Sequence, residues 1–351
     1  MVCFTSLGRT LPLLLRATAT TTPRFLLARA LSGSVGGGAT VDTRALLRRH
    51  SGWGGLRVAA RMMLDSSDSA SAAGQMQPQQ RSAGAVACSA QDGGAAGYAS
   101  GGWSREDGKL KCGYSSFRGK GTTMEDFYDV KLMKIDGQPV SLFGVFDGHG
   151  GPRAAEYLKE NLFENLLKHP EFLTDTKLTI SETYQKTDTD FLESESNAFG
   201  DDGSTTSVVG GHLYVASVGD SRAVVSKAGK AMALSEDHKP NRSDERKRIE
   251  NARGVVIWAG TWRVGGVLAM SRAFGNRLLK PFVVAEPEIQ EELVNEDLEC
   301  LVLASDGLWD VVENEEAVSL AKTEDLPESV ARKLTEIAYS RGSADNITCI
   351  V

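Results

Sequence analysis

The feature that most constrains this sequence is a repeated pairing of a short apolar run with an aspartate-containing turn. The pairing occurs at three places, where Phe143–Phe146 precedes Asp147, Val215–Val218 precedes Asp220 and Leu301–Ala304 precedes Asp306. A fourth aspartate, Asp345, stands just before the run Ile347–Ile350. Because taking an unpaired carboxylate out of water is costly, an acid at the end of a buried strand needs a counter-charge. A divalent metal ion would supply it.

The chemistry of these turns favours a hard cation. Glycines follow two of the aspartates, at Gly148 and Gly307, and a glycine lets its backbone approach an ion closely. Ligands that are all oxygen atoms select Mg²⁺ or Mn²⁺ over zinc. Two such ions held by carboxylates are suited to the transfer of a phosphoryl group to water. A single Asp-Gly is more typical of an ordinary turn, and it is the three occurrences together that favour a site.

His149 lies inside the first of these turns, between Gly148 and Gly150. With an ordinary pKa near neutrality, it is a candidate general acid that protonates a leaving oxygen. The alternative is a structural role, in which its ring is hydrogen-bonded and orients neighbouring groups.

The apolar pattern predicts an α+β fold. Strands are expected at 141–146, 213–218, 223–225 and 300–304, with hairpin turns at Gly210-Gly211 and Ala228-Gly229 that indicate antiparallel pairing. Helical spacing predicts one helix from about Ala155 to Leu166, after Pro152, and another around Val330–Ile337, after Pro327. Asn314 is expected to cap a helix that runs toward Lys322.

The first 110 residues differ in composition from the rest. Residues 1–64 contain nine arginines, no lysine, no glutamate and one aspartate, which is typical of an organellar transit peptide, although a tail of biased composition is the alternative. Residues 65–110 are rich in Ser, Ala, Gly and Gln and are expected to form an unstructured linker. The folded domain is expected to span residues 111–351.

Charge and composition exclude several classes of protein. Residues 111–351 carry 27 basic and 40 acidic side chains, a net charge of −13, which argues against a nucleic-acid partner because phosphate neutralisation needs clustered basic groups. We expect no membrane span, since no apolar run reaches about 18 residues. The five cysteines form no CxxC pair, so neither a disulfide scaffold nor a zinc finger is indicated.

Taken in order, the motifs of residues 111–351 resemble those of the metal-dependent protein phosphatases, the type 2C serine/threonine phosphatases, and in particular their plant members. The segments that carry this resemblance are 123–126 (TMED), 146–151 (FDGHGG), 203–205 (GST), 218–223 (VGDSRA), 268–275 (LAMSRAFG), 304–310 (ASDGLWD) and 342–348 (GSADNIT). So many ordered motifs across one domain make the resemblance specific.

The resemblance implies a four-layer αββα sandwich, in which two antiparallel sheets are flanked by helices and a centre for two Mg²⁺ or Mn²⁺ ions lies at one end. It implies metal-binding roles for five residues, namely Asp147 (bridging both ions), Gly148 (through its carbonyl), Asp306, Asp345 and, at a third and weaker site, Asp220. Glu125 and Asp126 would hold water bound to the ions, and His149 would be the general acid. Activated water would attack phosphorus directly, without a phosphoenzyme.

One departure from the family pattern concerns the substrate phosphate. The family usually has an arginine three residues before the methionine of the first motif, and here that position is Gly121. A weak or inactive pseudophosphatase that acts as a regulatory binding module is therefore the alternative to an active enzyme. A hydrolase of small phosphate esters is a third interpretation. The interval from Gly203 to Asp220 is also shorter than the family's usual one, which would trim a central hairpin.

We expect phosphorylated proteins as substrates and a monomeric enzyme. The localisation depends on residues 1–64: mitochondrion or plastid if they form a transit peptide, and otherwise cytoplasm or nucleus.

Overall fold

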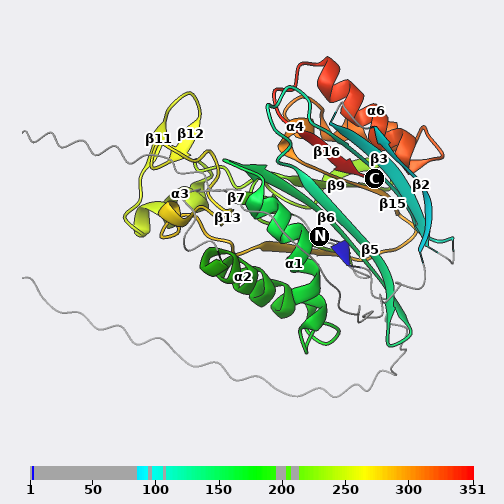
Figure 1. Cartoon of the computed structure of the whole chain (residues 1–351), viewed down its shortest axis with the longest axis horizontal. Helices are drawn as coiled ribbons and strands as arrows, with labels where there is room; N and C mark the ends of the chain where they lie inside the picture. The colour runs from blue at the N-terminus through cyan, green and yellow to red at the C-terminus, as the bar shows by residue number, and fades with distance from the viewer. Residues whose placement is uncertain (1, 4–84, 94–96, 106–107, 195–202, 207–212) are drawn as a thin grey trace, which may run out of the picture. The chain divides into compact units, whose positions relative to one another are not determined.

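Two layers of antiparallel strands form the centre of the protein (Figure 1). The computed structural model describes residues 2–3, 85–93, 97–105, 108–194, 203–206 and 213–351. The first layer is a seven-stranded sheet with the order β10 (Lys230–Ala233), β9 (Arg222–Lys227), β15 (Leu298–Ala304), β16 (Ile347–Ile350), β4 (Lys111–Phe117), β3 (Tyr98–Arg105) and β2 (Ala85–Gly93).

The facing layer consists of two hydrogen-bonded groups of strands. One has the order β13 (Phe274–Gly275), β7 (Gly203–Thr206), β6 (Gln138–His149) and β5 (Phe127–Ile135), and the other has the order β1 (Val2–Cys3), β8 (Leu213–Ser217) and β14 (Glu288–Glu292). A separate hairpin joins β11 (Val256–Trp258) to β12 (Trp262–Val264). All ladders between named strands are antiparallel among the described residues.

Helices cover the outer faces of both layers. The helices are α1 (Arg153–Lys168), α2 (Thr176–Ser194), α3 (Ser243–Asn251), α4 (Asp306–Trp309), α5 (Asn314–Ala321) and α6 (Pro327–Ser340), with a 3₁₀ turn at Arg277–Leu279. Helices α1 and α2 pack on β6 and β8, whereas α4, α5 and α6 pack on the seven-stranded sheet. The α+β sandwich expected from the sequence is confirmed.

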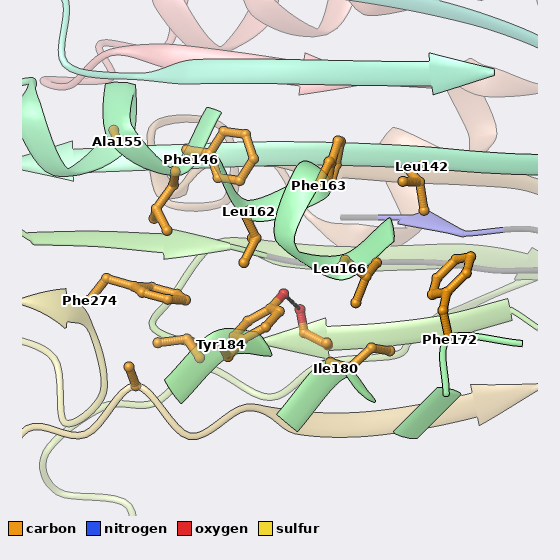
Figure 2. Close-up of a cluster of buried hydrophobic side chains, with 14 of the residues drawn as sticks. Leu142, Phe146, Ala155, Leu162, Phe163, Leu166, Phe172, Ile180, Tyr184 and Phe274 are labelled. Carbon is orange, nitrogen blue, oxygen red and sulfur yellow. Dashed lines mark hydrogen bonds between the residues drawn. The ribbon is translucent and has the colours of Figure 1, made fainter. Parts of the chain in front are cut away.

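Strand β6 illustrates how the sequence builds these layers. Leu142 and Phe146 point into the cluster beneath α1 and α2, while Phe143 and Val145 point into the core between the two sheets. This alternation is what a strand buried on both faces requires. Figure 2 shows the helix-side cluster, in which the hydroxyl of Tyr184 donates a hydrogen bond to the carbonyl of Ala216 at 3.2 Å. The burial fixes β6, and therefore the turn that follows Phe146.

Most of the expected elements are present. The four predicted strands coincide with β6, β8, β9 and β15, although β8 ends one residue before the predicted strand 213–218. The predicted helices correspond to α1 and α6, and Ala228-Gly229 forms the β9–β10 turn. Gly210-Gly211 lies outside the described residues. Asn314 is not the cap of α5: the helix is preceded by Glu313, and the Asn314 Oδ1 atom accepts a hydrogen bond from Arg222 Nη1 at 3.0 Å. A contact to a distant strand therefore takes the side chain away from its own helix.

The predicted linker of residues 65–110 extends too far. Residues 85–93 and 98–105 form β2 and β3, and β3 pairs with β4 along its length. Ser100 in β3 is buried, and its hydroxyl donates to Glu328 Oε1 at 2.9 Å. Although this strand has several glycine and serine residues, it forms because β4 supplies partners for its backbone hydrogen bonds. The predicted transit segment lies outside the described residues, apart from Val2–Cys3 in β1.

No helix in the described part of the chain combines the length and apolar character that a membrane crossing requires.

Candidate metal centre and active site

The first part of the site is the end of β6. Asp147, Gly148 and His149 are its last three residues, and their backbone is held by pairing with Gly203–Thr205 of β7. Gly148 is needed here, because a Cβ atom at this position would lie 2.5 Å from the carbonyl oxygen of Glu125. The missing side chain allows the segment that contains Glu125 to cross β6 next to Asp147.

The second part is the turn after β15, which begins α4. The backbone N–H of Ser305 donates to the Thr348 carbonyl at 3.0 Å, and the Thr348 N–H donates to Ser305 Oγ at 3.1 Å. A Cβ atom on Gly307 would lie 1.9 Å from the Asn346 carbonyl oxygen, so only glycine allows this approach. The contact brings the loop that carries Asp345 against the start of α4, where Asp306 lies.

The third part is the segment Glu125-Asp126, which is held by hydrogen bonds to Ser305 and Asn346. Asp126 is buried, and its Oδ2 atom accepts a hydrogen bond from Ser305 Oγ at 2.8 Å. The Glu125 N–H donates to Asn346 Oδ1 at 2.6 Å. The Glu125 carboxylate accepts from Thr123 Oγ1 at 2.7 Å and from the Gly151 N–H at 3.1 Å. Both carboxylate oxygens of Glu125 therefore already accept hydrogen bonds from the loops around the site.

The fourth part is Asp220, in the turn between β8 and β9. The preceding residue, Gly219, has φ +100°, a conformation that favours glycine. Asp220 is 3% exposed, and carboxylate oxygens of Asp147, Asp220 and Asp306 all lie within 4.8 Å of one another. Three of the aspartates predicted from separate strand ends thus converge.

The charges in this cluster repel one another. Burial raises the pKa of Asp147 well above its usual range, and the nearby charges of Asp306, Asp126 and Asp220 raise it further. Burial likewise raises the pKa of Asp306, with Asp220 and Asp345 adding to the effect. The pKa of Asp126 rises to about 7, mainly through burial. Asp345 therefore belongs to the same electrostatic cluster.

These residues fit a hard divalent cation. Asp220 Oδ1 is buried and has no hydrogen-bond donor among the described residues, so it offers a lone pair to a ligand. The converging groups are carboxylates, which are the donors that Mg²⁺ and Mn²⁺ prefer. Opposing charge would relieve the repulsion that raises the aspartate pKa values.

His149 is held by a residue to which the sequence pattern assigned no role. Its Nε2 atom lies 2.9 Å from Asn276 Oδ1, in a hydrogen bond that gives the ring a fixed orientation. Asn276 is buried and has φ +47°, a left-handed conformation that asparagine tolerates better than most residues. The sequence assigned no role to Asn276, to Lys239, which contacts Asp220, or to Asn346, although Asn346 lies within the motif 342–348. Local spacing does not encode these long-range contacts.

Gly121, where the family usually has arginine, lies in the loop before Glu125. A Cβ atom at this position would be 2.5 Å from Asn346 Nδ2, the atom that donates to the carbonyls of Arg118 and Thr123 at 2.8 and 3.0 Å. The glycine therefore lets the loop close on Asn346.

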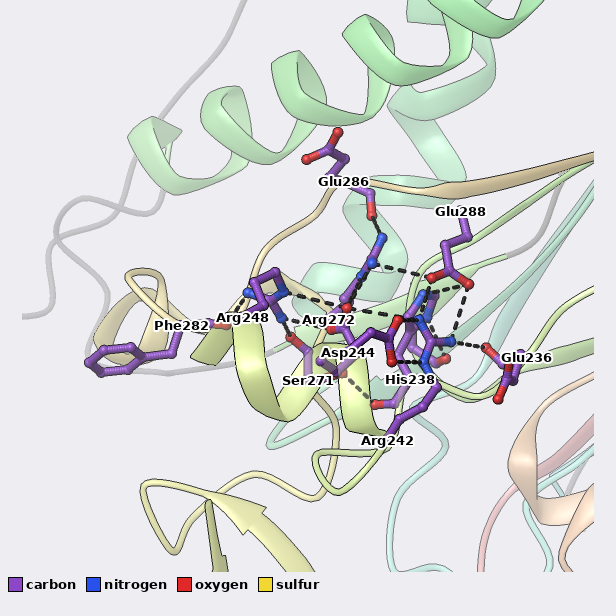
Figure 3. Close-up of polar contacts among 12 residues, drawn as sticks. Glu236, His238, Arg242, Asp244, Arg248, Ser271, Arg272, Phe282, Glu286 and Glu288 are labelled. Carbon is purple, nitrogen blue, oxygen red and sulfur yellow. Dashed lines mark hydrogen bonds and ion pairs between the residues drawn. The ribbon is translucent and has the colours of Figure 1, made fainter. Parts of the chain in front are cut away.

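A second group of acids, Asp244, Glu245 and Glu288, also has carboxylate oxygens within 4.8 Å of one another. Figure 3 shows that Arg242, Arg248 and Arg272 surround it. Arg272 and Arg248 each approach Glu245 to 2.7 Å. Although burial opposes the effect, the hydrogen bonds from these arginines lower the pKa of Glu245. This group is an ion-pair cluster that ties α3 to β14, not a cation site.

The hairpin β11–β12 presents two tryptophans of different exposure. Trp258 is 60% exposed, whereas Trp262 is half-buried and lies beneath the guanidinium of Arg246, 5.6 Å from the ring centre. The two rings pack edge to face with centroids 5.5 Å apart.

Comparisons with known proteins agree with this geometry. The model of the family described as "Protein phosphatase 2C" matches residues 110–347. A rice protein (Oryza sativa subsp. japonica), "Probable protein phosphatase 2C member 13, mitochondrial", is 92% identical over 354 residues, covering 100% of this chain and 98% of its own. The Arabidopsis thaliana protein "Probable protein phosphatase 2C 76" is 71% identical over 258 residues, covering 73% of this chain and 61% of its own.

A solved structure shows the same fold. The serine-threonine phosphatase 2C of Toxoplasma gondii superposes with a TM-score of 0.62 at 24% identity, covering 68% of this chain and 93% of its own. At that identity the superposition supports the fold alone. The family model matches about two thirds of this sequence, and the rice relative matches all of it. This chain therefore belongs to the protein phosphatase 2C family.

Proposed function

We propose that this protein phosphatase hydrolyses phosphoserine and phosphothreonine in proteins with Mg²⁺ or Mn²⁺ as cofactor. The observation that carries the proposal is that carboxylate oxygens of Asp147, Asp220 and Asp306 lie within 4.8 Å of one another, while one buried oxygen of Asp220 has no donor in the described part of the chain. When bound, the ions polarise the phosphoryl group and lower the pKa of coordinated water.

We assign the ligands of two ions to the end of β6, the turn after β15 and the loop before β16. Asp147, the carbonyl of Gly148, Asp306 and Asp345 would hold these ions. The tight packing of Gly148 on Glu125 and of Gly307 on Asn346 supports this assignment, because it holds the three chain segments in fixed positions. Asp220 would serve a third, weaker site.

The remaining polar groups would position water and move a proton. Asp126, fixed by Ser305, and Glu125, fixed by Asn346, would orient water at the ions. His149 would donate a proton to the serine or threonine oxygen as it leaves, and its contact with Asn276 supports the role because it fixes the ring. Without that proton the serine would have to leave as an alkoxide, which is a poor leaving group.

The comparisons do not support the alternative of an inactive pseudophosphatase. The family match and the relatives described above are all named phosphatases. A preference for small phosphate esters is the competing activity, and it is separated by measuring phosphopeptide and p-nitrophenyl phosphate turnover side by side.

The decisive experiment is phosphate release from a phosphothreonine peptide by the full chain. Turnover is expected with added Mn²⁺ or Mg²⁺ and should stop when a chelator removes the ions. Asp147→Asn should lose at least about a thousandfold in kcat, since it removes a carboxylate that would hold the ions. Turnover that persists in chelator, or an unimpaired Asp147→Asn variant, would contradict the proposal.

We also propose that the protein is mitochondrial. The rice relative carries that word in its name and matches the whole of this chain, including the arginine-rich residues 1–64. A fusion of residues 1–64 to a fluorescent protein should colocalise with a mitochondrial dye. Plastid or diffuse cytosolic fluorescence would contradict this localisation.

A further inference from the structure

A lysine lies on the acidic centre at Asp220. Lys239 Nζ is 2.5 Å from Asp220 Oδ2, whereas the other oxygen of that carboxylate, Oδ1, is buried and has no hydrogen-bond donor among the described residues. The charges of Asp306 and Asp237 also act on the ammonium group. The lysine therefore contacts one oxygen of this carboxylate, while the other oxygen has no hydrogen-bond donor among the described residues.

The backbone builds this pair. The His238 N–H donates to the Gly219 carbonyl at 2.9 Å, and the Gly219 N–H lies 3.1 Å from His238 Nδ1. His238 is fully buried, and its own carbonyl accepts from Ser271 Oγ at 2.9 Å. Because the residue before Lys239 is fastened to the residue before Asp220, the two side chains are held beside each other.

The side chain of Lys239 has room to move away from Asp220. Its ammonium group reaches the buried carboxylate of Asp220 from the surface of the protein. The side chain is 41% exposed, and it lines a cavity of about 450 Å³ together with Arg222, Asp237, Asn241 and Asn314. The ammonium group can therefore move away from Asp220 without a steric clash when an ion replaces it.

We propose that the ammonium group of Lys239 occupies the cation position at Asp220 and competes with a divalent ion for it. Lys239 then sets how weakly the third ion binds. The proposal rests on the function proposed above, since it concerns the same centre. It goes beyond that function because it names a residue that weakens binding of the third ion only. Binding of the two ions assigned to Asp147 and Asp306 would not change.

The test is titration of the chelator-stripped full chain with Mn²⁺ by isothermal calorimetry. The wild type should show tight binding followed by a weaker step. In Lys239→Met the weaker step should tighten at least about tenfold, because a positive charge a few ångströms from the ion is removed. In Lys239→Arg, which keeps the charge, it should stay within about twofold of the wild type.

Two further variants make the result specific. Lys322→Met removes a lysine of similar exposure, 34%, that pairs with Glu299 at 2.6 Å, and it should leave both steps unchanged. Asp220→Asn should abolish the weaker step, and Lys239→Met added to it should have no further effect on Mn²⁺ binding. Without ions, Lys239→Met should melt at a lower temperature than the wild type, since Asp220 loses its partner.

The outcomes separate this inference from the proposed function. A normal tight step with a weaker step that is unchanged or weakened in Lys239→Met would overturn the competition alone. Absence of any Mn²⁺ binding by the folded wild type would overturn both. A Lys239→Met protein that does not fold is replaced by Lys239→Gln, for which the same tightening is expected.

Discussion

The backbone N–H of Glu125 donates a hydrogen bond of 2.6 Å to the side-chain oxygen of Asn346, across 221 residues of sequence. The Nδ2 atom of the same side chain donates to the carbonyls of Arg118 and Thr123. One buried amide therefore fixes the loop before Glu125 and Asp126 to the loop that carries Asp345.

Replacing Asn346 should impair both stability and activity. Asn346→Ala leaves a buried N–H and two carbonyls without their partner, so we expect a loss of about 2–4 kcal/mol in the free energy of unfolding. We also expect kcat to fall, because Glu125 and Asp126 are released. Urea unfolding and phosphopeptide turnover measure the two effects. Asn165→Ala, which removes a contact with Thr187 on the helix layer, should lower stability with little change in kcat.

At Gly121 the effect of the Cβ atom can be separated from that of a guanidinium group. Gly121→Ala should lower the melting temperature, because its Cβ atom crowds Asn346 Nδ2. Gly121→Arg carries the same Cβ atom and adds a group that can bind phosphate in a bidentate manner. Relative to Gly121→Ala, we expect it to lower the KM for a phosphopeptide several-fold. Equal KM values in the two variants would show that another group already holds the phosphate.

Asn276 should matter most when the leaving group needs a proton. Asn276→Gly keeps the left-handed backbone but removes the contact with His149. We expect kcat for a phosphoserine peptide to fall about tenfold or more, with a much smaller effect on p-nitrophenyl phosphate, whose leaving group is good. His149→Ala should show the same substrate-dependent pattern. A uniform loss on both substrates would indicate a structural role for the pair.

Metal removal should reverse the effect of Asp306→Asn on the melting temperature. Without ions, Asp306→Asn removes one of several closely spaced acidic groups, and we expect it to melt at a higher temperature than the wild type. With saturating Mn²⁺ the order should invert, because the wild type binds the ion more tightly and binding stabilises the folded state. Thermal unfolding in chelator and in Mn²⁺ checks the prediction. An unchanged order would argue against Asp306 as a ligand.

Lowering the pH should remove the contribution of Glu288 to the free energy of unfolding. Its hydrogen bond with His238, and then those with Arg242, lower its pKa from 4.5 to about 2. A carboxyl whose pKa is lowered by folding stabilises the protein above its unfolded pKa, and this contribution is lost as the pH falls from 4.5 toward 2. The difference in unfolding free energy between the wild type and Glu288→Gln should therefore shrink across that range. A difference independent of pH would contradict this assignment.

Much of the fold and part of the centre could be predicted from local sequence. The alternation along β6 and the spacing in α1 and α6 are short-range patterns, and each predicts one element together with the face it buries. The aspartates at the ends of β6, β8 and β15 were recognisable because an acid after an apolar run needs a partner. The family motifs added the expected grouping of those ends.

The tertiary structure decided which residues support the centre. Asn346 contacts Glu125, Asn276 contacts His149 and Lys239 contacts Asp220 because strands remote in sequence end at the same place, and no local spacing encodes such contacts. For the same reason residues 98–105, which are rich in glycine and serine, have no strand pattern of their own, yet they form β3 beside β4. The sequence by itself determined the elements and their acidic ends, whereas packing and hydrogen bonding between distant segments determined the neighbours of each acid, because those interactions exist only once the chain has folded.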